Sequence, residues 1–135
     1  MTKDNIIVTN LRGTSGKIEI SDGMSFDLRP PTLHNPSEQL TPKHMVGMAW
    51  ATCLNATIIS IFKTNKKENK SRVRVVAESK TDAANGLHYI LTAYVAIEDY
   101  DENETLKFAN MADRLCPISK LIEKNQFVSL KYEEY

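Results

Sequence analysis

The sequence predicts an α+β fold in which antiparallel strands wrap around one long buried central helix. The predicted strands come in hairpins rather than alternating with helices, which argues against a doubly wound α/β sheet. Residues 45–62 contain no charged side chain, and their apolar residues occupy every side of a helical wheel. A helix of this kind is buried on all sides, so the rest of the chain must wrap it. A length of 135 residues is enough for one domain with a real core, predicted to span residues 1–135.

The composition narrows the possible functions. The 17 basic and 17 acidic side chains balance, so no basic surface points to nucleic acid or an anionic membrane as a partner. The first ten residues include no long apolar stretch, so no signal peptide and a cytoplasmic location are expected. Two cysteines in that compartment are expected to be reduced, catalytic or buried rather than joined in a structural bridge.

The segment before the helix predicts short strands. Residues 6–9 and 17–20 have β-branched content, and residues 24–28 alternate apolar with polar side chains. Asp22-Gly23 between the last two runs predicts a hairpin, because both residue types tolerate a positive φ. Residues 29–39 hold three prolines and are predicted to form a loop.

Thr41 followed by Pro42 marks the predicted helix start, since Thr can cap and Pro fits the first helical position. The uncharged stretch reaches the lower length limit for crossing a bilayer, about 17 to 20 residues. A core helix is favoured, because Thr52, Asn55 and two other hydroxyl residues interrupt the stretch. A helix with no polar face needs more cover than one small sheet supplies, so oligomerisation through it is expected.

Beyond residue 62 a basic connection is predicted, then two strands, a helix and a final strand. The strands fall at residues 72–78 and 87–97, with a turn at Asn85-Gly86. The helix follows the acidic residues 98–104, which complement a helix dipole. The last strand is predicted at residues 127–132.

The two cysteines are the residues best suited to chemistry. Cys116 precedes Pro117 at a predicted junction where a new turn begins, and the unpaired N–H groups of a helix N-terminus lower a thiol pKa. Cys53 lies in mid-helix, where burial raises the pKa unless a cation faces it. Each cysteine taken alone is also compatible with a small core residue.

No metal and no cofactor are expected. His34, His44 and His88 are far apart and lack ligand spacing. The segment from Gly13 to Lys17 lacks the gap between glycines of a phosphate loop, and no dinucleotide-binding glycine pattern is present.

Two motifs resemble those of a known family. They are Thr41-Pro42-Lys43-His44-Met45 with Ala49-Trp50-Ala51-Thr52-Cys53, and Leu115-Cys116-Pro117-Ile118-Ser119. The first resembles the helix start and first cysteine, and the second the second cysteine motif, of the OsmC/Ohr family of osmotically inducible and organic hydroperoxide resistance proteins. The 63 positions between the cysteines and the Ser-Asp-Gly hairpin also suit that family.

This resemblance implies an intertwined homodimer with active sites at the subunit boundary, acting as a peroxidase on organic hydroperoxides. Cys53 would be the peroxidatic thiolate and would become a sulfenic acid. Cys116 would then form a disulfide with it, and an external dithiol, lipoyl-like or a small thiol, would reopen the bridge.

The resemblance also implies a cation beside Cys53, an Arg held by a Glu near the helix start. Arg12 falls close to the expected Arg, but Lys43 stands at the position of the Glu and would repel it. Glu38 is the nearby acid that could substitute for the missing Glu, and Lys43 could itself supply the cation.

Two alternatives remain open on sequence grounds. The Lys43 departure motivates a redox sensor or small-molecule binding protein on the same fold with little turnover. The other alternative is a structural dimer in which Cys53 and Cys116 are both core residues.

Overall fold

A computed structural model describes residues 5–29 and 40–135. By internal contacts the chain divides into two compact units, Met1–Met45 and Val46–Tyr135, which are described separately. The predicted loop at residues 29–39 and the candidate residue Glu38 fall almost entirely outside the described part. The prediction of a single domain over residues 1–135 stays a prediction.

The N-terminal unit holds a three-stranded antiparallel sheet in the order β1-β2-β3. The strands are β1 (Val8–Leu11), β2 (Lys17–Ile20) and β3 (Ser25–Asp27), with a short 3-10 turn, η1 (Gly13–Ser15), between the first two. Gly23 has a φ of +98°, and the Met24 N–H donates to the Asp22 carboxylate at 3.0 Å. The predicted Asp-Gly hairpin is therefore confirmed, and β1 begins two residues later than the pattern indicated.

The long helix, α1 (Pro42–Thr64), begins where Thr41-Pro42 predicted. The Thr41 N–H donates to His44 Nδ1 at 3.1 Å, which satisfies a donor at the helix start, where N–H groups have no intrahelical partner. Local sequence signals were enough to place this end.

A single chain buries only one side of α1. Trp50, Leu54, Ile58, Ile61 and Phe62 are buried, at the three- and four-residue spacing of one helical face. Val46, Met48 and Ile59 are exposed. The expectation of burial on all sides is therefore not met within one copy of the chain, because one sheet and two shorter helices cover one side only. By length and hydropathy alone α1 could cross a bilayer, but its buried residues belong to the core of a folded unit.

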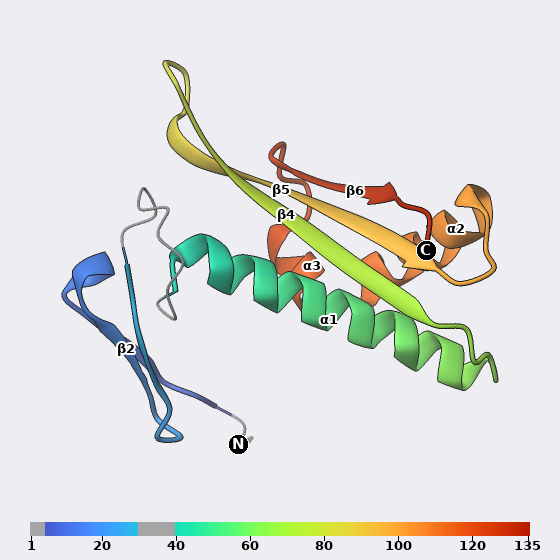
Figure 1. The fold of residues 1–135 in the computed structure, drawn as a ribbon, viewed down its shortest axis with the longest axis horizontal. Helices are drawn as coiled ribbons and strands as arrows, with labels where there is room; N and C mark the ends of the chain where they lie inside the picture. The colour runs from blue at the N-terminus through green and yellow to red at the C-terminus, as the bar shows by residue number, and fades with distance from the viewer. Residues whose placement is uncertain (1–4, 30–39) are drawn as a thin grey trace. The chain divides into compact units, whose positions relative to one another are not determined.

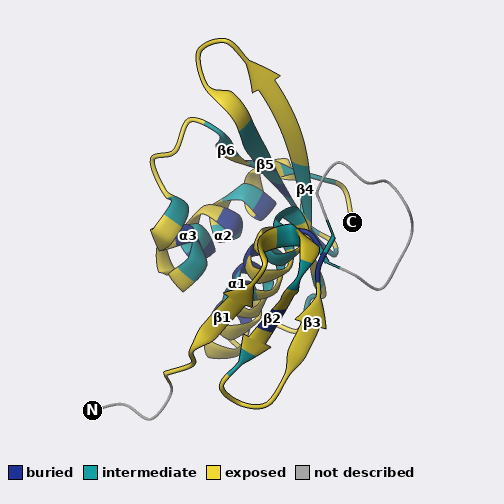
Figure 2. Ribbon diagram, turned by 90° about the vertical axis from the view of Figure 1, so that its left-hand side faces the viewer, coloured by how far each residue is buried: buried dark blue, intermediate teal, exposed yellow. Residues whose placement is uncertain are grey.

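The C-terminal unit is built on a second three-stranded sheet, in the order β4-β5-β6. β4 (Ser71–Asp82) and β5 (Gly86–Ile97) form a long antiparallel hairpin whose register runs from Ser71↔Ile97 to Asp82↔Gly86. Gly86 has a φ of +63°, which confirms the predicted Asn-Gly turn. The hairpin end extends past α2 and α3 (Figure 1), and that end is exposed whereas the other half of β5 is largely buried (Figure 2).

The last strand, β6 (Val128–Tyr132), pairs with β5 in parallel, so the antiparallel wrapping expected from the sequence holds for the other strand pairs only. A parallel pairing requires a crossover connection, and here two helices provide it. They are α2 (Glu102–Leu115), which begins at an Asp101–Glu104 capping box, and α3 (Pro117–Ile122), which the sequence indicated only as a turn after Cys116.

The core of this unit lies between the helices and one face of the sheet. It joins the buried face of α1 to alternate residues of β5, Leu91, Ala93, Val95 and Ile97, and to Ala109 and Ala112 of α2. Because Ala109 and Ala112 are small, the α2 backbone can lie close to β5 and β6, the strands that it contacts.

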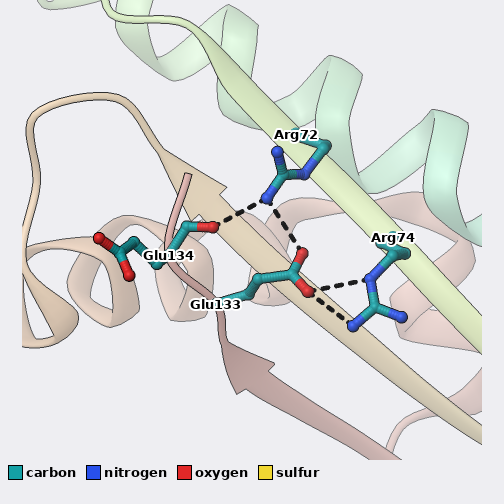
Figure 3. Close-up of polar contacts among 4 residues, drawn as sticks. All are labelled: Arg72, Arg74, Glu133 and Glu134. Carbon is teal, nitrogen blue, oxygen red and sulfur yellow. Dashed lines mark hydrogen bonds and ion pairs between the residues drawn. The ribbon is translucent and has the colours of Figure 1, made fainter.

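The residues that follow β6 form a polar cluster with two arginines of β4 (Figure 3). The Glu133 carboxylate pairs with Arg74 at 2.6 Å and with Arg72 at 3.2 Å. Arg72 also donates to the Glu134 carbonyl at 2.9 Å. Since β5 lies between β4 and β6, these bonds span the width of the sheet.

Candidate active site

The folded C-terminal unit brings the two cysteines together. Cys53 is on α1 and Cys116 stands between α2 and α3, and the two thiols are close enough for each to influence the pKa of the other. Both are free thiols. Two thiols that are 63 positions apart along the chain are thus neighbours in the folded unit.

The backbone between α2 and α3 sets the position of Cys116. Its N–H donates to the Ala112 carbonyl at 2.7 Å and ends α2. Its own φ and ψ of −65° and 121° turn the chain, and Pro117 then starts α3, where a missing N–H has no cost. The predicted junction at Cys116 is confirmed.

The two thiols differ in access. Cys116 is fully buried, whereas Cys53 is half-buried and lines a groove between α1 and α2 with a volume of about 560 Å³. The other lining residues are Ala56, Thr57, Ser60, Ile61, Thr64, Asn65, Met111 and Leu115. None of them is charged, so the groove suits the organic part of a small molecule.

Cys116 is surrounded by hydrogen-bond donors. The Ser119 N–H donates to Cys116 Sγ at 3.4 Å, and the Ser119 side chain lies close enough to act on the pKa of that thiol. Ser119 in turn accepts a hydrogen bond from Trp50 Nε1 at 2.9 Å. Donors around a thiol favour its charged form.

The pKa values of the pair move apart. Burial raises the pKa of Cys53, and the neighbouring Cys116 raises it further against a hydrogen bond from the Ile118 backbone. Burial also acts to raise the pKa of Cys116, but the hydrogen bonds from Ser119 and Cys53 outweigh it and lower that pKa. Of the two thiols, Cys116 therefore loses its proton more readily within the C-terminal unit.

The proposed cations belong to the N-terminal unit. Arg12 has a φ of +72°, in the left-handed region, and strained residues of this kind are frequent at functional sites. It is exposed and lines a hollow of about 460 Å³ with Lys17 and Asp27 among others. Lys43 is half-buried in the first turn of α1. Their roles beside Cys53 stay predictions, as does that of Glu38, which lies outside the described residues.

Sequence reasoning did not single out the hydrogen bond between Trp50 and Ser119. A signal was present, because a buried Trp N–H usually needs an acceptor and Ser119 lies within the second cysteine motif. Nothing local in the sequence pairs the two, since 69 positions separate them.

Comparison with known proteins agrees with this fold. The family model for OsmC-like proteins matches residues 35–131. An organic hydroperoxide resistance protein-like sequence of Mycoplasma genitalium is 23% identical over 121 residues, covering 87% of this chain and 86% of the relative.

Solved structures give the same result. A Lactobacillus casei protein superposes with a TM-score of 0.87 at 21% identity, covering 100% of this chain and 94% of the other. The organic hydroperoxide resistance protein OhrB of Bacillus subtilis gives 0.77 at 22% identity, with 97% and 96% covered. The matched family model spans both cysteine motifs, and the chain therefore belongs to the OsmC/Ohr family.

Proposed function

We propose that this protein is a thiol peroxidase that reduces organic hydroperoxides to alcohols. The observation that carries the proposal is the proximity of two free thiols, of which Cys53 lines a groove and Cys116 is buried. Family membership and relatives named for organic hydroperoxide resistance support the same reaction.

The reaction has two steps. The Cys53 thiolate attacks the terminal oxygen of the hydroperoxide, the O–O bond breaks, and the alkoxide takes a proton to leave as an alcohol, so that Cys53 becomes a sulfenic acid. Cys116 then displaces the sulfenic hydroxyl as water and forms a disulfide with Cys53. An external dithiol reduces the disulfide by exchange.

The groove supports an organic substrate. Its walls are uncharged and largely apolar, so they favour a hydroperoxide with a hydrocarbon part. Hydrogen peroxide has no such part, and we expect it to react more slowly with Cys53.

We further propose that the protein works as a cytoplasmic homodimer. Met48 and Ile59 are exposed and eleven positions apart, about three helical turns, so they lie on one side of α1. A second copy of the chain would cover that side, as the resemblance implies.

The test of this function is a stoichiometry. One equivalent of an organic hydroperoxide added to reduced protein is expected to release one alcohol and consume two thiols. The Cys53→Ser variant should consume neither the peroxide nor Cys116. Retention of both thiols in the wild-type protein under excess peroxide would contradict the proposal.

The cation that activates Cys53 can be identified by variants that move its reactivity in opposite directions. If Arg12 is the cation, Arg12→Ala slows the reaction of Cys53 with hydroperoxide, whereas Lys43→Ala accelerates it because a charge that repels Arg12 is removed. If Glu38 also holds Arg12 in place, Glu38→Gln slows the reaction as well. If Lys43 is the cation, Lys43→Ala slows the reaction. Lys17→Ala is a matched control, because Lys17 lines the same hollow as Arg12.

The second candidate function is a redox sensor or small-molecule binding protein with little turnover. The raised pKa of Cys53 favours it, because the thiolate is the reactive form. Steady-state assays with a dithiol reductant separate the two: repeated peroxide consumption indicates an enzyme, and a single oxidation without cycling indicates a sensor.

A further inference from the structure

A chain of buried hydrogen bonds runs from α1 through α3 to Cys116. The Trp50 indole N–H donates to Ser119 Oγ at 2.9 Å, and the Ser119 N–H donates to Cys116 Sγ at 3.4 Å. Trp50 is 1% exposed, Ser119 2% and Cys116 0%. Solvent therefore does not replace these bonds.

Trp50 fixes the direction of the Ser119 hydroxyl. An indole N–H can only donate, so the Ser119 oxygen must accept from it, and the hydroxyl hydrogen has to point elsewhere. The Ser119 side chain lies close enough to the Cys116 sulfur to act on its pKa, so we assign the sulfur as the group toward which this hydrogen points. Cys116 thus has the Ser119 N–H as a donor, with the Ser119 hydroxyl and Cys53 of α1 close enough to act on its pKa.

We propose that Ser119, held by Trp50, is a positioning residue that keeps Cys116 as the nucleophile for disulfide closure. The proposal rests on the peroxidase function above and concerns its second step. The Cys116 thiolate supplies the electron pair of the new S–S bond and is oxidised, and the sulfenic sulfur of Cys53 is reduced as its S–O bond breaks. The hydroxide leaves and takes a proton from solvent, so this step needs no outside reductant.

The lowered pKa of Cys116 agrees with this arrangement. Burial acts against the thiolate, and the hydrogen bonds from Ser119 are the first of the opposing causes. The charged groups nearest to Trp50 and Ser119 are Asp113 of α2 and the Glu123 and Lys124 side chains, which line a hollow of about 120 Å³ with them.

Separate measurement of the two steps tests the proposal. Reduced protein is mixed with one equivalent of tert-butyl hydroperoxide, sulfenic acid is trapped with dimedone, and disulfide is quantified after rapid quenching, from about pH 6 to about pH 10. In Ser119→Ala we expect that Cys53 still forms its sulfenic acid and that the pH profile of disulfide closure moves to higher pH. At a pH below the pKa of Cys116, a rise of one unit in that pKa lowers the fraction of Cys116 present as thiolate about tenfold. A thiolate of higher pKa is a stronger nucleophile, which offsets part of this loss, so closure slows about three- to fourfold for each unit. Above both pKa values the closure rate should recover.

Trp50→Phe should shift the profile in the same direction by less, since Ser119 remains but is no longer oriented. If Ser119→Ala does not fold, Trp50→Phe decides, because it leaves no unpaired donor behind. Ser79→Ala, on an exposed part of β4, is the control and should leave both steps unchanged.

An equal loss of closure rate at every pH would show a merely structural role for Ser119 and overturn the proposal, as would an unchanged profile in both variants. Absence of any sulfenic acid or disulfide in the wild-type protein would instead remove the peroxidase function itself, and the role of Ser119 with it.

Discussion

At the scale of single residues, the two cysteines differ in their solvent exposure and in the direction of their pKa shifts. Cys53 meets the groove and has a raised pKa, whereas Cys116 is buried among donors and has a lowered one. Sequence reasoning anticipated both directions, because mid-helix burial and a position before Pro117 have known effects on thiols. It could not find Trp50 as the residue that orients Ser119, since that bond depends on how α1 and α3 pack.

Replacement of Cys116 should change the titration of Cys53. In Cys116→Ser a hydroxyl that does not ionise in this range replaces the second thiol, so the part of the Cys53 shift due to Cys116 is lost and the pKa of Cys53 falls. The rate of Cys53 alkylation, measured by mass spectrometry against pH, should reach its midpoint at a lower pH than in the wild-type protein. An equal or higher midpoint would contradict the coupling of the pair.

At the scale of helices and strands, local signals predicted most elements and topology decided the rest. Thr41-Pro42 placed the start of α1, and the two Asx-Gly pairs placed both hairpin turns. The parallel pairing of β6 with β5 was not predictable from the sequence. It depends on how α2 and α3 pack against the sheet, because this packing decides which strand β6 lies beside. The six residues of α3 are too few for a periodic pattern.

The Glu133 cluster gives an element-scale prediction on pH. Arg74 and Arg72 lower the pKa of the Glu133 carboxylate from its ordinary value of 4.5. A carboxyl with a lowered folded-state pKa contributes stability above its ordinary value and loses it as the pH falls through the folded value. The difference in melting temperature between wild type and Glu133→Gln should therefore be largest near neutral pH and shrink below about pH 4. Glu134→Gln, whose side chain is outside the cluster, is the control, and a difference that grows in acid would contradict the account.

At the scale of the whole molecule, the side of α1 left exposed by one chain is its most informative feature. The sequence predicted a helix with no polar face, and the structure covers one face of it. Since one chain leaves apolar residues of α1 exposed, we propose that a second copy of the chain covers them.

A charge on that side should break the proposed homodimer. Ile59→Lys places an ammonium group where apolar contact is expected, and its burial without a partner is strongly unfavourable. Sedimentation velocity should show a monomer for Ile59→Lys and a dimer for the wild type. Leu121→Lys is the matched control, because Leu121 on α3 is also exposed. A dimer that persists in Ile59→Lys, or is lost equally in Leu121→Lys, would place the interface elsewhere.

The intact mass of the protein after one equivalent of organic hydroperoxide tests the central claim most directly. If Cys53 is oxidised and Cys116 closes on it, the wild-type protein loses about 2 Da, and Cys116→Ser gains about 16 Da as a sulfenic acid. A gain of about 16 Da in the wild-type protein that never converts to the loss, or no mass change in either protein, would contradict the pairing of the two sulfurs as a reacting unit.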